Sequence, residues 1–78
     1  MVQGTIKFSE TEAKFCIVDE DNMKFLDFLE FGDEFEANVD GKWVRTKLEI
    51  ITNEAEELVF SLKGTPYNGV LDGVEIRR

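Results

Sequence analysis

The sequence predicts an all-β domain, a small antiparallel barrel or rolled sheet of five or six strands, and three observations point to it. Short segments alternate apolar and polar residues with the period of two that a half-buried strand requires. Turn-forming residues separate these segments, and the clearest turn is Asp40-Gly41. The chain has 78 residues, which suits one domain over residues 1–78 and leaves little room for both a core and a deep substrate pocket.

The first predicted hairpin has its loop at residues 10–13. With that loop, Phe8 lies opposite Phe15 and Ile6 lies opposite Ile17. Both apolar pairs then fall on one face, as a hairpin with one buried face requires.

Asp40-Gly41 predicts a second hairpin, because an Asp-Gly pair suits the positive backbone angles of a two-residue type I′ turn. The register that follows places two pairs on the inner face and two opposite-charge pairs on the outer face: Ala37 with Val44, Phe35 with Thr46, Glu36 with Arg45, and Glu34 with Lys47. Opposite charges across two strands favour this register by a few tenths of a kcal/mol each.

A third hairpin is predicted with its turn at residues 53–55. It sets Leu58 opposite Ile50 and Phe60 opposite Leu48, and it leaves an acidic tip in solvent.

The last predicted strand follows a loop at residues 64–69. Pro66 cannot lie in a central strand, and the segment is otherwise rich in turn formers. After it, Val74 and Ile76 alternate with polar residues, which predicts a short closing strand.

Residues 19–32 are ambiguous, because their apolar residues fit both the helical and the strand spacing. One short helix within residues 21–31 is one alternative. A strand or irregular arm leading into a turn at Gly32-Asp33 is the other.

The composition argues against several function classes. Seventeen acidic residues against nine basic ones give a net charge of −8, so we expect no direct nucleic-acid binding and no contact with an anionic membrane. The absence of histidine removes the commonest general base and neutral metal ligand. No leader or membrane-spanning run is visible, and we expect a cytoplasmic protein.

The remaining candidate motifs support no chemistry. Cys16 is the single cysteine, so neither a disulfide within the chain nor a thiolate zinc cluster is possible, and it has no histidine to activate it. The acidic run at residues 19–22 lacks the glycine and the distal glutamate of a calcium loop. We therefore predict no enzyme, no cofactor and no metal site.

Parts of the chain resemble two groups of small β domains. Residues 29–35, followed by the turn and Trp43, resemble Src-homology-3-like small barrels, in which a Gly-Asp turn leads into a central strand and a tight hairpin. More of the chain resembles a family of very small, uncharacterised bacterial domains, found mainly in Gram-positive bacteria and often on mobile elements. The matching motifs are Gly4–Ile6, Gly32-Asp33, Gly41–Thr46 and Leu71–Arg77, whereas the loop with Tyr67 and the segment Leu58–Phe60 depart from the family pattern. This resemblance implies no activity and no site.

Trp43 is the main candidate for a binding residue, because the predicted register places it on the outer face beside Asn38 and Lys42. An exposed tryptophan can anchor a protein partner. Alternatively, the loop that contains Pro66 and Tyr67 covers the ring as a second small core.

We expect a small acidic accessory domain that binds an unknown protein partner and has no catalytic activity. The surface around Trp43, with Lys42, Asn38 and Tyr67, or a free strand edge would hold the partner. The alternative is an acidic inhibitor that mimics nucleic acid in the basic groove of a nuclease or a DNA-binding protein. Mimicry requires rows of carboxylates on one face. The oligomeric state, monomer or weak dimer, stays open.

Overall fold

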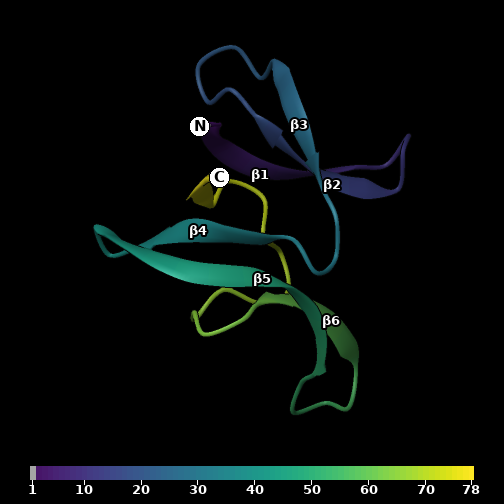
Figure 1. Ribbon diagram of the computed structural model, residues 1–78. Helices are drawn as coiled ribbons and strands as arrows, with labels where there is room; N and C mark the ends of the chain where they lie inside the picture. The colour runs from purple at the N-terminus through teal and green to yellow at the C-terminus, as the bar shows by residue number, and fades with distance from the viewer. Residues whose placement is uncertain (1) are drawn as a thin grey trace.

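The computed structural model describes residues 2–78, which form one antiparallel sheet of seven strands (Figure 1). The strands in chain order are β1 (Gln3–Ser9), β2 (Lys14–Val18), β3 (Phe25–Leu29), β4 (Glu34–Val39), β5 (Lys42–Thr52), β6 (Leu58–Leu62) and β7 (Glu75–Arg77). Their order across the sheet is β3-β2-β1-β7-β4-β5-β6, so β3 and β6 are its edges. The predicted all-β fold is confirmed, but seven strands replace the expected five or six, and the sheet does not close into a barrel.

Of the two alternatives for residues 21–31, the short helix is wrong and the strand is confirmed, because β3 occupies this segment and pairs with β2. Met23 has a φ of 58°, which a right-handed helix does not accommodate. The turn before it is fixed by side chains, since Asp19 Oδ1 accepts from the Asp21 amide at 2.8 Å and Asn22 Oδ1 from the Lys24 amide at 2.9 Å. These local bonds compete with a helix and favour a turn into a strand.

The first two predicted hairpins are confirmed in register. In β1 and β2, Ile6 pairs with Ile17 and Phe8 with Phe15. The β4–β5 pairing is the one that the Asp-Gly turn predicts throughout its length. Asp40 and Gly41 have φ values of 52° and 85°, as a type I′ turn requires.

One detail of the second hairpin differs from the prediction. Of Glu34 and Glu36, only Glu34 forms an ion pair with β5, and its partner is the diagonal neighbour Arg45. Glu34 pairs with Arg45 at 3.2 Å. Glu36 instead pairs with Arg77 of β7 at 2.9 Å, since β7 lies on the other side of β4 and sets Arg77 opposite Glu36. The register predicted for the hairpin could not include the pair of Glu36 and Arg77, because β7 comes from far along the chain.

The predicted register of the third hairpin is wrong by two residues. Ile50 pairs with Phe60 and Leu48 with Leu62, so the connection runs from residue 53 to residue 57. The Asn53 side chain explains the longer turn, because its Oδ1 accepts from the amides of residues 55 and 57 at 2.9 and 3.0 Å. A slip of two residues keeps every side chain on its face, so the apolar alternation could not detect it.

The core lies on the inner face of the curved sheet and takes residues from all seven strands and from the loop before β7. It consists of Ile6, Phe15, Ile17, Leu29, Phe35, Ala37, Leu48, Leu62, Leu71 and Ile76. The packing at β1 excludes a side chain from Gly4, because a Cβ there would collide with the carbonyl oxygen of Val18.

Both edges of the sheet are partly covered. In β3, the Phe28 amide donates to Asp27 Oδ1 at 2.9 Å, and the Phe28 carbonyl accepts from Arg78 Nη2 at 3.2 Å. Arg78 also pairs with Asp27 and, at 3.1 Å, with Asp33. In β6, backbone bonds from residues 67–69 reach the strand. Covered edges resist pairing with another chain, so strand addition at these positions has to displace existing bonds.

Arg78→Ala tests this cover of the β3 edge. We expect a loss of about 1 kcal/mol in unfolding free energy, since the ion pairs are partly exposed, together with faster amide hydrogen exchange in β3. Urea unfolding and NMR-detected exchange measure the two effects. Arg45→Ala is the control, because it removes a more exposed ion pair that joins β5 to Glu34 and makes no bond to β3. Unchanged exchange in β3 would contradict the proposed cover.

Candidate functional site

The four sequence-predicted site residues lie at one end of the β4–β5 hairpin. Asn38 and Trp43 are opposite each other in the register, and Lys42 is exposed beside the turn. Tyr67 approaches from its loop, and its hydroxyl donates to the Asn38 carbonyl at 2.8 Å. The structure therefore places the predicted set in one region.

Within this region, Trp43 is half-buried and lies under Arg77. The Arg77 guanidinium is 4.2 Å from the centre of the indole ring, an arrangement that neither interpretation of the sequence foresaw. Tyr67 packs against the core rather than forming a second small core on the outer face. Both ends of the Asn38 amide are already bonded, to Glu75 at 2.6 Å and to the Gly41 amide at 2.8 Å. A partner-binding role for this surface stays a prediction.

Removal of the Arg77 guanidinium should expose the indole ring of Trp43 to solvent. We expect Arg77→Ala to shift Trp43 emission to longer wavelength and to raise its quenching by acrylamide, because one face of the indole loses its cover. Acrylamide is neutral, so the change of charge does not bias the result, and Trp43 is the single tryptophan in the chain. Arg45→Ala should leave both signals unchanged. Equal quenching in all three proteins would show that Arg77 does not cover the ring in solution.

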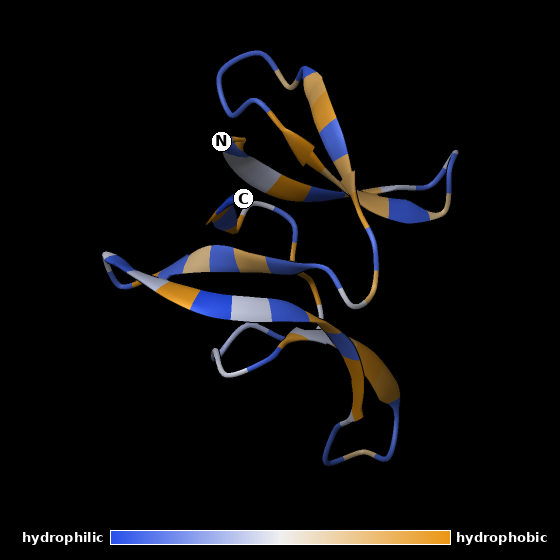
Figure 2. Cartoon of the chain, viewed as in Figure 1, coloured by the Kyte–Doolittle hydropathy of each residue, from blue (hydrophilic) through white to orange (hydrophobic). Residues whose placement is uncertain are grey.

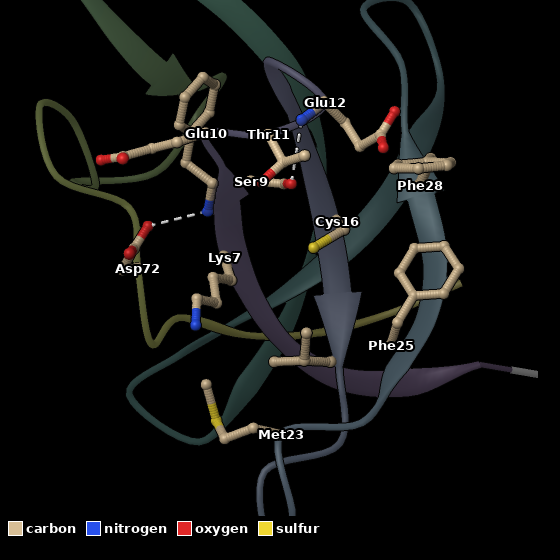
Figure 3. A pocket seen from close by; sticks show the side chains of 12 residues that line it. Lys7, Ser9, Glu10, Thr11, Glu12, Cys16, Met23, Phe25, Phe28 and Asp72 are labelled. Carbon is tan, nitrogen blue, oxygen red and sulfur yellow. Dashed lines mark hydrogen bonds between the residues drawn. The ribbon is translucent and has the colours of Figure 1, made fainter.

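A groove that the sequence reasoning missed lies on the outer face of β1, β2 and β3 (Figure 3). Its volume is about 660 Å³. The floor is formed by Lys7, Cys16 and Val18, and one side is lined by Met23, Phe25 and Phe28. The signal was present in the sequence: once residues 25–29 are read as a strand, the register sets Phe28 opposite Cys16 on this face.

The wall of the groove consists of exposed apolar side chains. Met23 is 53% exposed and Phe25 is 50% exposed. The rings of Phe25 and Phe28 lie against each other with their centres 4.8 Å apart. Figure 2 shows β3 as a mostly hydrophobic strand on the outside of the sheet. Apolar side chains that stay in water are a common mark of a contact surface.

Cys16 in the groove floor is a neutral thiol. Burial raises the pKa of this thiol from its ordinary value of 9.0, Lys7 acts to lower the pKa, and Asp72 acts to raise it. The thiol has no histidine to activate it, since the chain contains none. The arrangement suits packing under a bound group and gives no support for nucleophilic chemistry.

The raised pKa predicts a dependence of stability on pH. Because the folded chain holds the thiol proton more tightly, the stabilisation is complete below the unfolded pKa and is lost as the pH rises through the folded pKa. As the pH rises past the ordinary thiol pKa of 9.0, wild-type unfolding free energy should fall more steeply than that of Cys16→Ala, because the unfolded chain loses the thiol proton first. Urea unfolding of both proteins measures the difference. Parallel profiles would contradict a buried thiol.

Residues 2–78 contain no cluster of three or more His, Cys, Asp or Glu side chains able to hold a metal ion. In the same part of the chain, no helix has the length and apolar character needed to cross a membrane.

An open antiparallel β domain with an apolar groove on its outer face is the class that the structure defines. The chain belongs to DUF5348, a domain of unknown function, which matches residues 4–77. No curated protein and no solved structure matches the chain. The expected relationship to a family of uncharacterised domains is thereby confirmed. The likeness to Src-homology-3-like barrels stays a prediction.

Proposed function

We propose that this domain is a non-catalytic protein-binding module, and that its contact surface is the groove on the outer face of β1, β2 and β3. The observation that carries the proposal is the exposed wall of Met23 and Phe25 beside the buried Cys16 and Val18 of the floor. A partner that covers this wall gains the free energy of removing apolar surface from water, about 25 cal/mol for each Å². Aromatic side chains of this kind are frequent anchors of protein interfaces.

The covered edges favour contact through a face of the sheet. Strand addition needs free backbone amides and carbonyls at the edge of a sheet. In β3, the side chains of Asp27 and Arg78 already bond to the backbone amide and carbonyl of Phe28. In β6, the backbone of residues 67–69 bonds to the strand. Of the two surfaces expected from the sequence, the free edge is therefore the less suitable. The face around Trp43 is a second candidate, but its groups bond to one another.

Nucleic-acid mimicry is less well supported, because the carboxylates of β3, of β4 and of the loop between them are paired with cations, which leaves no continuous row of free carboxylates there. Within residues 2–78, the paired residues are Asp27, Glu30, Asp33, Glu34 and Glu36. A mimic presents unpaired carboxylates to a basic groove. The cytoplasmic location, the bacterial source and the mobile-element setting stay predictions from the sequence.

The test compares protein capture from a lysate of the source organism by three immobilised proteins. These are the wild type, Phe25→Ser in the groove wall, and Leu58→Ser at the far end of the molecule as a matched control. Leu58 is also exposed, at 76%. We expect one partner on the wild type and the control, and binding at least about 30-fold weaker by Phe25→Ser, which corresponds to about 2 kcal/mol. Capture that Phe25→Ser does not weaken would contradict the assignment of the groove, provided that its melting temperature matches the control.

A further inference from the structure

We propose that the groove binds a polypeptide segment with an apolar anchor flanked by lysine or arginine; this rests on the proposed function. The charge around the groove favours such a segment. Its lining contains three acidic side chains, Glu10, Glu12 and Asp72, against one basic side chain, Lys7. In Figure 3 the two glutamates come from the β1–β2 turn at one end, and Asp72 lies across the groove from the phenylalanines.

The groove carboxylates form no ion pair. Within residues 2–78, no ion pair involves Glu10, Glu12 or Asp72, whereas the carboxylates of β3, of β4 and of the loop between them pair with Lys14, Arg45, Arg77 and Arg78. Asp72 Oδ1 accepts a hydrogen bond from the Phe8 amide at 3.2 Å. Unpaired carboxylates beside an apolar surface attract a basic ligand and repel an acidic one. The groove therefore selects the charge of its partner as well as its hydrophobicity.

Met23 lines the opposite end of the groove. Charges of both signs flank it in the chain, because the exposed Glu20 and Asp21 precede it and the exposed Lys24 follows it. The strand between the two ends, β3, has five residues, which span roughly 17 Å. A bound segment of that reach meets Glu10 and Glu12 at one end, Asp72 across the groove and aromatic side chains along β3. Its complement is an apolar centre with basic residues beside it.

The aromatic wall is suited to such residues. Lys14 Nζ already lies 5.3 Å from the centre of the Phe28 ring, so a cation is accommodated beside the wall within the chain itself. Cations bind the faces of aromatic rings, and the long stems of lysine and arginine pack on apolar surface. A basic residue of the partner can therefore lay its stem on Phe25 and direct its charge to a carboxylate.

The test is selection from a random ten-residue peptide library displayed on phage, with the immobilised 78-residue chain as bait. Phe25→Ser serves as the counter-selection. We expect the enriched peptides to carry an aromatic or large aliphatic residue flanked by lysine or arginine. Their affinity, measured by fluorescence polarisation, should fall as salt rises, because screening weakens exposed charges.

Two double variants with the same change of net charge separate a local from a general electrostatic effect. Glu10→Gln with Glu12→Gln should weaken binding of the selected peptides about tenfold. Glu54→Gln with Glu57→Gln, at the β5–β6 tip, should leave binding unchanged, since this tip lies at the far end of the molecule (Figure 1).

The outcomes distinguish the inference from the function on which it rests. If no peptide is enriched on the wild type over Phe25→Ser, both the groove as a binding surface and the basic segment are wrong. If enriched peptides lack basic residues, or if both double variants weaken binding equally, the inference is wrong and the binding function stands.

Discussion

The short strand β7 is the element on which the rest of the structure depends. It pairs with β1 on one side and with β4 on the other, and so joins β1–β2–β3 and β4–β5–β6 into one sheet. Three residues supply few ladder bonds, but the strand is reinforced. Ile76 is fully buried, and Val2 and Arg78 exchange two backbone hydrogen bonds of 2.7 Å. Without this strand, each set of three strands would expose the apolar face that the other now covers.

The side chains of Glu75 and Arg77, on the outer face of β7, hold the neighbouring strands. Glu75 bonds to Asn38, and Arg77 holds Glu36 and covers Trp43. The next residue, Arg78, reaches the edge strand β3. The surface around Trp43 is thus largely engaged in holding β7 beside β4 and β5. The network reaches β3 only through Asp27 and the Phe28 carbonyl, and the side chains that line the groove on β1, β2 and β3 take no part in it.

The acidity of the chain consequently has more than one physical role. Some carboxylates neutralise cations that tie the strands together, and others, such as Asp19, accept backbone hydrogen bonds in turns. A third group forms no ion pair within residues 2–78, and it includes Glu10 and Glu12 at the groove as well as Glu54 and Glu57 at the β5–β6 tip. The net charge of −8 is the sum over all three groups. For the proposed recognition only Glu10, Glu12 and Asp72 matter, because they line the groove together with the exposed apolar side chains.

The sequence by itself determined the all-β class and the first two hairpins, since turn chemistry and a period of two act between near neighbours along the chain. Tertiary structure decided the rest. The β5–β6 register, two residues away from the prediction, depends on the Asn53 turn, and a strand over residues 25–29 depends on pairing with β2. The cover on Trp43 and the groove beside Phe25 arise only where distant strands meet. Non-local pairing leaves no periodic signal in the sequence, because the partner residues are separated by intervening hairpins.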